Sequence, residues 1–471
     1  MEKASWIWFA LFAVGLGASC AQSAECPDNL AALDGACFPQ SVVDAKQKGS
    51  TSSLDGSSSD GVNADGVHLQ DCDPHCIITA KDLQSNYFGA AVAVDGDDLF
   101  VAASDDSDAA SKAGAAYFFE RDQTGSWKQI QKITVSDAEA NDFLGLGGAA
   151  SMHEKRLIVG ASYNRDLLGT PKGAAYIFEK NEDGVWKETQ LLDIEYTAPN
   201  STTYASSVVI HGDYAVVGAY LEDQGPKQDY GAIYIYKRED DGRWQRSFRY
   251  AGDSYNEYRR FGRALAFDGE TLVVGAPGWN PDDSHSAGAG GVEVLSRVSD
   301  SYWDAEVLAT PAPMQSDEEI GASVAVYGDD LAVGHLRRDG STGAVSLYHR
   351  DASGAWSYVT MLQPSELMAA DQFGFALSMK DDALFVGAPF HVSEATTKGA
   401  VFVYTRSRLD NIWSYEKTIT APGGESGDHF GARLDFDGQR LVVGHGEKDS
   451  PSIQNQGAVY VFDYNVSTTQ P

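Results

Sequence analysis

The sequence FGFALSMKDDALFVGAP, residues 373–389, contains the pattern that decides the fold. An aromatic residue and Gly open it, small and large residues then alternate up to an Asp-Asp turn, and a second apolar run ends at Gly387. Alternation with a period of two is typical of β-strands, and a short polar turn between two such runs indicates a hairpin. The pattern occurs seven times, and its copies repeat every 53 to 59 residues.

Every copy carries common landmarks. The first is an aromatic or aliphatic residue followed by Gly or Ala: Phe88-Gly89, Leu146-Gly147, Tyr204-Ala205, Phe261-Gly262, Ile320-Gly321, Phe373-Gly374 and Phe430-Gly431. Thirteen residues after the second member of each pair lies another Gly or Ala: Ala102, Gly160, Gly218, Gly275, Gly334, Gly387 and Gly444. A Trp opens a later apolar run in six copies: Trp127, Trp186, Trp244, Trp303, Trp356 and Trp413. Because each Trp recurs once per copy, we interpret it as a packing residue.

Each copy thus predicts four short antiparallel strands and no helical period. One such sheet cannot bury both of its apolar faces, whereas seven sheets in a ring cover one another, so we predict an all-β, seven-bladed β-propeller. The seventh copy ends without a Trp run, and residues 76–80 precede the first copy where residues 130–134 precede the second. We therefore predict that this N-terminal strand pairs with residues 459–462 and closes the ring, which removes exposed strand edges.

Two copies carry the motif complete, as Phe261-Gly262 with Gly275-Ala276-Pro277 and Phe373-Gly374 with Gly387-Ala388-Pro389. This motif resembles the FG-GAP repeat of integrin α-subunit head propellers and many bacterial surface proteins. The resemblance spans residues 76–464 and implies the fold, but one fold hosts many activities. Integrin repeats bind Ca²⁺ through an Asp-rich loop between the first two strands. Here those loops, such as residues 95–98, are too short to surround an ion with six or more oxygens, so we expect tight turns, no integrin-type calcium site and no cofactor. Cation binding elsewhere on the acidic surface stays open.

The charge composition limits the classes of molecule that the protein is expected to bind. The 471 residues contain 35 Lys and Arg against 68 Asp and Glu, a net charge of −33. Nucleic acid and anionic lipid would be repelled, which leaves protein surfaces and neutral glycans as the expected partners.

The N-terminus predicts export. Residues 1–19 have the layout of a signal peptide, and no later apolar run is long enough to span a bilayer. Residues 41–71 are rich in Ser, Gly and Asp and cannot bury enough surface to fold. The expected organisation is a signal peptide at 1–19, a short Cys-containing segment at 20–40, a flexible linker at 41–71, the propeller at 72–464 and a tail at 465–471.

All five cysteines lie within the first 76 residues. Cys20 follows Leu16-Gly17-Ala18-Ser19, which resembles a bacterial lipobox except that Gly17 occupies the position that favours Leu. Acylation of Cys20 predicts an outer-membrane or cell-surface lipoprotein held only by its lipid, and ordinary cleavage nearby predicts plain secretion. The four cysteines other than Cys20 suggest disulfides between Cys26 and Cys37 and between Cys72 and Cys76. A metal site at residues 72–76 is the alternative, although it lacks the second half of a structural zinc site.

Loop lengths indicate which face recognises a ligand. The turns between strands one and two keep a constant length, whereas the loops between strands two and three vary and share the opposite face with the blade connections. Variable loops on a rigid scaffold usually carry recognition. The candidate residues on that face are His285, His335, His391, His429, His445, Asp371 and Asp428. On the inner strand of the seventh copy, Arg433 and Asp435 break the small-residue pattern, and we expect them to form an ion pair near the channel.

No nucleophile elbow, His-Glu-x-x-His motif or phosphate loop occurs. The leading hypothesis is a non-enzymatic, surface-tethered module that binds a protein or glycan. The alternative is a polysaccharide hydrolase or lyase with paired carboxylates at the channel mouth. A lectin with one site per blade would need alike loops, which the sequence does not show.

Overall fold

The structure is a computed structural model, and it divides into two compact units, residues 1–60 and 61–471, which are described separately. The described residues are 30–33, 36–39, 75–79, 86–164, 172–193, 203–225, 227–252, 258–279, 288–311, 313–393, 396–448 and 455–464. In the first unit, β1 (Leu30–Leu33) pairs antiparallel with β2 (Ala36–Pro39). The predicted signal peptide and linker, and Cys20, Cys26 and Cys72, lie outside the described residues, so the predictions made for them stay predictions.

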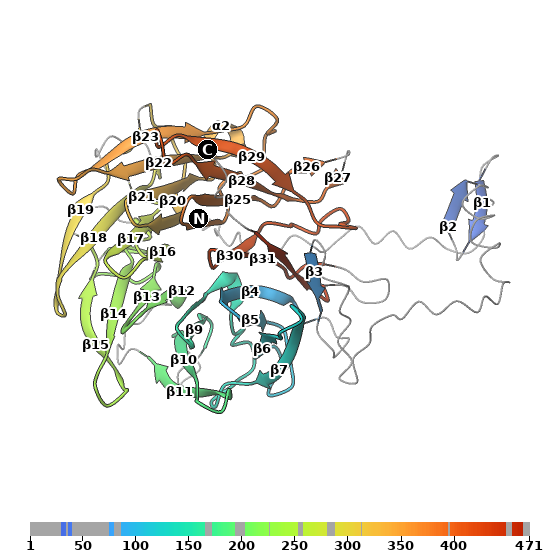
Figure 1. The fold of residues 1–471 in the computed structure, drawn as a ribbon, viewed down its shortest axis with the longest axis horizontal. Helices are drawn as coiled ribbons and strands as arrows, with labels where there is room; N and C mark the ends of the chain where they lie inside the picture. Colours follow the sequence, from blue (N-terminus) through green and yellow to red (C-terminus); the bar gives the residue numbers. More distant parts are fainter. Residues whose placement is uncertain are drawn as a thin grey trace, which may run out of the picture. The chain divides into compact units, whose positions relative to one another are not determined.

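The second unit is a ring of seven four-stranded antiparallel sheets, with β4, β12, β16, β20 and β30 among the strands nearest its centre (Figure 1). The predicted seven-bladed propeller is confirmed. Blade 1 contains β4 (Phe88–Asp95), β5 (Asp98–Ala103), β6 (Ala115–Arg121) and β7 (Trp127–Ile133). Blade 2 contains β8 (Ala150–His153), β9 (Arg156–Ala161), β10 (Ala174–Lys180) and β11 (Trp186–Leu192). Blade 3 contains β12 (Tyr204–His211), β13 (Tyr214–Ala219), β14 (Ala232–Arg238) and β15 (Trp244–Tyr250).

The remaining blades have the same order. Blade 4 contains β16 (Ala264–Phe267), β17 (Thr271–Ala276), β18 (Gly291–Ser299) and β19 (Tyr302–Val307). Blade 5 contains β20 (Ile320–Tyr327), β21 (Asp330–His335), β22 (Ala344–Arg350) and β23 (Trp356–Leu362). Blade 6 contains β24 (Leu377–Lys380), β25 (Ala383–Ala388), β28 (Ala400–Arg406) and β29 (Trp413–Ile419), with a small ribbon of β26 (Val392–Ser393) and β27 (Thr396–Thr397) in its loop. Blade 7 contains β30 (Arg433–Phe436), β31 (Arg440–His445), β32 (Ala458–Asp463) and the N-terminal β3 (His75–Ile78).

The ring closes where the two ends of the propeller meet. Strand β3 pairs antiparallel with β32, with Cys76 opposite Val461 and Ile78 opposite Val459. Closure by an N-terminal strand is therefore confirmed, with the strand at 75–78 rather than 76–80. Ile78 is fully buried, so this short strand contributes to the core as well as to the ladder.

Adjacent blades bury each other's apolar faces. Phe118 of blade 1 stacks on Trp186 of blade 2, with ring centroids 4.8 Å apart. The carboxamide of Gln131 also forms two hydrogen bonds with the backbone of Trp186. Its Oε1 accepts from the Trp186 amide at 3.0 Å, and its Nε2 donates to the Trp186 carbonyl at 2.8 Å. Gln190 and Trp244 repeat this arrangement one blade on. The repeated Trp residues are packing residues, as predicted.

The predicted first landmark of blade 2 is wrong by two residues. The amide of Leu144 bonds the carbonyl of Ala113, as the amide of Phe261 bonds that of Tyr230 in blade 4. Leu144-Gly145 therefore occupies the landmark position, and the 3₁₀ turn η1 (Leu146–Gly148) is an insertion before the strand. The repeated Leu-Gly dipeptide in this segment led to the misplacement.

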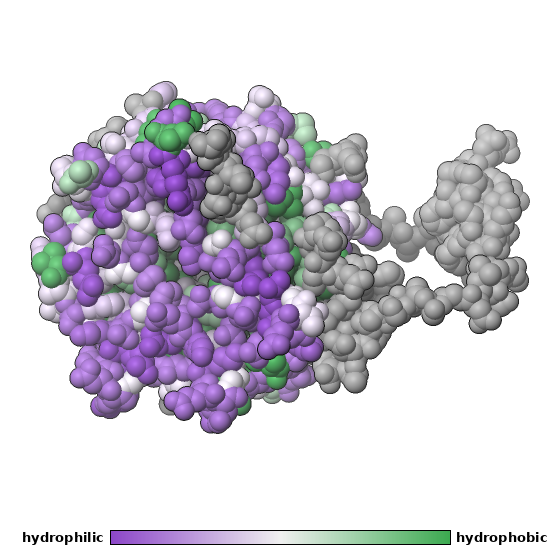
Figure 2. All heavy atoms as spheres, in the orientation of Figure 1, coloured by the Kyte–Doolittle hydropathy of each residue, from purple (hydrophilic) through white to green (hydrophobic). Residues whose placement is uncertain are grey.

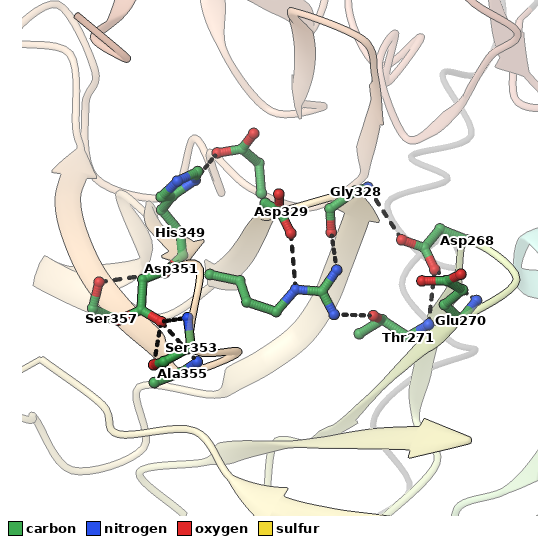
Figure 3. Close-up of polar contacts among 12 residues, drawn as sticks. Asp268, Glu270, Thr271, Gly328, Asp329, His349, Asp351, Ser353, Ala355 and Ser357 are labelled. Atoms are coloured by element: carbon green, nitrogen blue, oxygen red, sulfur yellow. Dashed lines mark hydrogen bonds and ion pairs between the residues drawn. The ribbon is translucent and has the colours of Figure 1, made fainter. Parts of the chain in front are cut away.

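Cationic side chains at the ends of third strands tie several blades to the blade before them. Arg350 of blade 5 donates to Thr271 Oγ1 of blade 4 at 3.2 Å and to Asp329 Oδ1 of its own hairpin at 2.9 Å. Figure 3 shows Thr271, Gly328 and Asp329 converging on this guanidinium. In the same way, Lys180 of blade 2 contacts Asp98 of blade 1, and Arg238 of blade 3 contacts Glu179 of blade 2.

Apart from η1, the helical structure in the described part is the four-residue α2 (Arg338–Ser341). No helix there is long and apolar enough to cross a membrane.

Candidate functional site

The two faces of the ring differ in their loops. The hairpin face bears the turns between first and second strands. These turns contain two residues in blades 1, 2, 3, 5 and 6 and three residues in blades 4 and 7. The predicted tight turns are confirmed. The loop face bears the connections between second and third strands and between blades. Its loops between second and third strands range from eight residues between His335 and Ala344 to 14 between Ala276 and Gly291.

A buried carboxylate lies two residues before the first landmark in several blades. These residues are Asp142, Glu318, Asp371 and Asp428. Each accepts a hydrogen bond from the backbone amide three residues before it, at 2.7 to 2.9 Å. A buried, hydrogen-bonded acid thereby fixes the loop that joins one blade to the next.

Three of these acids face a histidine at or just after the end of a second strand. The pairs are Glu318 with His335 and Asp371 with His391, both at 2.8 Å, and Asp428 with His445 at 3.7 Å. Buried polar networks of this kind stabilise one loop conformation when their members are satisfied.

The structure buries most of the residues that the sequence predicted for recognition. Five of them are at most 9% exposed: His335, His391, His445, Asp371 and Asp428. They hold the loops from inside and present no side chain to a ligand. His429 keeps 29% of its side chain exposed and contacts Glu447, and His285 lies outside the described residues.

The sequence analysis placed these histidines and acids on the loop face, but it did not predict that the histidines pair with the acids. The signal was available, since an acid precedes the landmark at a fixed offset and a histidine follows the second strand. Antiparallel pairing sets Ile320 opposite His335, which brings the acid at 318 beside the imidazole.

One of the pairs extends into an array with the composition of a catalytic triad. The ring of His335 contacts Glu318 through Nδ1 and Ser346 Oγ through Nε2, each at 2.8 Å. All three residues are fully buried, and Arg338 also contacts Glu318. A substrate could not reach Ser346 Oγ, so this array stabilises blade 5 and its loop.

His445 gives the propeller an acid-sensitive contact. Burial lowers the pKa of His445 to about 3, whereas an unfolded histidine titrates near 6.5. Below pH 6.5 the unfolded chain binds a proton that the folded chain does not, so stability falls as the pH drops toward 3. We expect the His445→Gln variant to lose about 2 kcal/mol less stability than the wild type between pH 7 and pH 5, measured by chemical denaturation at both pH values. Parallel pH slopes in the two proteins would contradict a neutral His445 in the folded state.

A polar cavity of about 160 Å³ lies in the central channel, between the inner strands of blades 7, 1 and 2 and the end of β24. Its charged and polar side chains are Asp95, Ser151, His153, Lys380, Arg433, Asp435 and Asp437. The predicted ion pair between Arg433 and Asp435 is wrong. Arg433 Nε donates to the carbonyl of Ala90 on the neighbouring inner strand at 3.1 Å, and Asp435 Oδ2 accepts from the amide of Val94 at 2.7 Å. Both side chains therefore serve the junction of blade 7 with blade 1.

The carboxylates of the cavity bind backbone amides of the following blade. Asp95 accepts from Glu154 at 2.7 Å, Asp435 from Val94 at 2.7 Å and Asp437 from Gly96 at 3.1 Å. Burial raises the pKa of Asp435 to about 6 despite these hydrogen bonds.

Two histidines meet where the cavity reaches the hairpin face. The rings of His153 and His211 stack with centroids 3.9 Å apart, and burial lowers the pKa of each. His153 Nδ1 accepts a hydrogen bond from the amide of Gly212 at 3.1 Å, which requires an unprotonated Nδ1. Repulsion between the stacked rings further disfavours the charged form.

The match to a family of repeats agrees with this architecture. The family model described as FG-GAP repeat matches residues 76–119, 127–178, 200–236, 356–404 and 413–462. No curated protein matches the chain. A crystal structure of a protein from Lactobacillus plantarum is similar at 13% identity and a TM-score of 0.47, over 72% of this chain and 86% of that chain.

The matched regions show how the sequence repeat maps onto the blades. The match at 76–119 runs from β3 through β6, and that at 413–462 runs from β29 through β32. Each of these units thus begins with the outer strand of one blade and ends with the third strand of the next. This offset explains why the ring needs β3 to complete its last blade. The chain is a seven-bladed β-propeller that carries FG-GAP repeats.

Proposed function

We propose that this propeller is an exported, surface-tethered binding module that recognises a protein or a neutral glycan through its loop face and catalyses no reaction. The observation that carries the proposal is the contrast between the two faces. Short turns repeat on the hairpin face, whereas the loop face varies in length around buried anchors. Rigid loops that differ among blades suit recognition of one asymmetric ligand.

Exposed aromatic side chains supply contact area on the loop face. Tyr163 follows β9 and is 44% exposed, and Tyr258 lies in the connection from blade 3 to blade 4 and is 49% exposed. Tyrosine offers an apolar ring with a polar tip, which suits both protein interfaces and sugar stacking. These two residues replace the buried histidines as the candidates for direct ligand contact.

The surface chemistry favours an uncharged or cationic ligand. The face drawn in Figure 2 is mostly hydrophilic, with small and separate hydrophobic patches. At a net charge of −33, polyanions are repelled at long range. Acylation of Cys20 would supply the tether, and the chain from 21 to 74 would separate the propeller from the surface.

The test is a binding screen of the full chain against neutral glycans and cell-envelope fractions, with matched tyrosine variants. We expect saturable binding that Tyr163→Ser and Tyr258→Ser each weaken by about tenfold, since an exposed aromatic contact contributes about 1–2 kcal/mol. The controls are Tyr302→Ser and Tyr358→Ser, whose residues are 53% and 44% exposed away from the loop face.

Equal losses in all four variants would remove the loop face as the recognition surface. Turnover of a polysaccharide without retention of any envelope component would favour the hydrolase or lyase alternative instead.

A further inference from the structure

The cavity in the central channel holds cationic donors without ionic partners, although its carboxylates already bind backbone amides. Arg433 lies toward the loop face and Lys380 toward the hairpin face. Neither forms an ion pair with a carboxylate of the described residues, and Nη2 of Arg433 has no hydrogen-bond partner among them. The unused hydrogen-bonding capacity of these side chains therefore suits a ligand rich in acceptors.

Arg433 departs from the pattern of the repeat. The same position, three residues after the first landmark, carries a small residue in five other blades: Ala91, Ser207, Ala264, Ser323 and Ala376. Blade 2 makes room for the long side chain, since a Cβ on Gly148 would lie 2.7 Å from Cδ of Arg433. Packing alone does not call for an arginine at a position that small residues fill around the ring.

Arg263 is a second arginine at the loop-face end of an inner strand, since it directly precedes β16 in blade 4. Arg263 is exposed, its side chain makes no hydrogen bond among the described residues, and its guanidinium lies over the ring of Tyr220 at 5.4 Å. Burial and the charge of Arg263 together lower the pKa of Arg433 to about 10, so the two cations act on each other. An anion between them would relieve this repulsion.

We propose that the loop-face end of the channel cavity binds a small carboxylate ligand, with Arg433 inside and Arg263 at the mouth as its cationic contacts. A planar guanidinium presents paired N–H groups that match a carboxylate. The cavity has the volume of about five water molecules at ~30 Å³ each, which limits the ligand to about the size of one sugar acid. A single negative charge also minimises repulsion by the acidic protein. This site is independent of the surface recognition proposed above.

The experiment is calorimetric titration of the full chain with sodium glucuronate at low ionic strength, with glucose as the neutral match. We expect saturable binding of glucuronate and none of glucose. Arg433→Gln and Arg263→Gln should each weaken binding at least about tenfold, because a hydrogen bond to a charged group is worth about 1.5–3 kcal/mol. Acetate should compete with glucuronate if the carboxylate is the recognised group.

The control is Arg243→Gln, since Arg243 is exposed near the hairpin face and pairs with Asp241. It should bind glucuronate as the wild type does. If Arg433→Gln fails to fold, Arg263→Gln decides, because the exposed Arg263 contributes little to folding. Equal heats for glucuronate and glucose, or wild-type affinity in the Arg263→Gln protein, would overturn the proposal.

Discussion

Replacing Arg259 with methionine is expected to lower the free energy of unfolding by about 3–5 kcal/mol. Arg259 is fully buried, its guanidinium contacts the carboxylate of Glu293, and it lies between the rings of Phe261 and Trp279 at 4.7 and 4.5 Å. Methionine retains much of the apolar contact and removes the charge. Glu293, which is also buried, would then keep a negative charge without its partner, and that penalty dominates the loss.

The matched control is Arg246→Met, at an exposed position on β15, which should change stability by no more than about 0.5 kcal/mol. Chemical denaturation of both variants measures the difference. The double variant Arg259→Met with Glu293→Gln should recover part of the loss, because no buried charge remains. Equal midpoints for Arg259→Met and Arg246→Met would show that the pair contributes little.

Arg259 also shows which kind of side chain occupies the position two residues before the first landmark. It lies two residues before the first landmark, where blades 5, 6 and 7 carry the buried acids Glu318, Asp371 and Asp428. In blade 4 the signs are reversed, with the cation before the landmark and the acid on the third strand. In blades 4 to 7 the position therefore holds a buried, paired side chain of either charge, and the partner changes from blade to blade.

Much of the fold was predictable because it depends on local pattern. Alternation, turn residues and landmark spacing specify strands and hairpins, and the absent Trp run after residue 464 indicated that β3 completes blade 7. The landmark of blade 2 failed because Leu144-Gly145 and Leu146-Gly147 fit the local pattern equally well. Hydrogen bonds from Leu144 to Ala113 and from Gly145 to Gly160 separate the two alternatives, and the bonded residues are distant in the sequence.

The candidate site was less predictable because its contacts cross between blades and strands. Arg433 and Asp435 share one strand face, and local reasoning paired them, yet Asp435 binds the amide of Val94, 341 residues away. Likewise, exposure was assigned to His335 and His445 from their place after the second strand. Burial depends on the acid that approaches from the blade connection, and its fixed offset before the landmark reveals the pairing only when it is combined with the antiparallel register of the strands.

Replacing Ile78 with alanine is expected to lower the free energy of unfolding by about 2–5 kcal/mol, a large effect for a strand of four residues. Ile78 is fully buried and pairs with Val459 in the short ladder by which β3 completes the last blade. The substitution removes apolar contact and leaves a cavity at the closure. Loss of β3 pairing would also expose the edge of β32, which could then pair with another chain.

Ile130→Ala is the matched control, because Ile130 lies on β7, the corresponding outer strand of blade 1, and is 39% exposed. It should shift the denaturation midpoint only slightly. Sedimentation at increasing concentration should show self-association of Ile78→Ala near its midpoint and not of Ile130→Ala, because only the former frees a strand edge. If Ile78→Ala were as stable as Ile130→Ala and remained monomeric, the ring would be held by contacts between blade faces alone. Closure by β3 would then protect an edge without stabilising the fold.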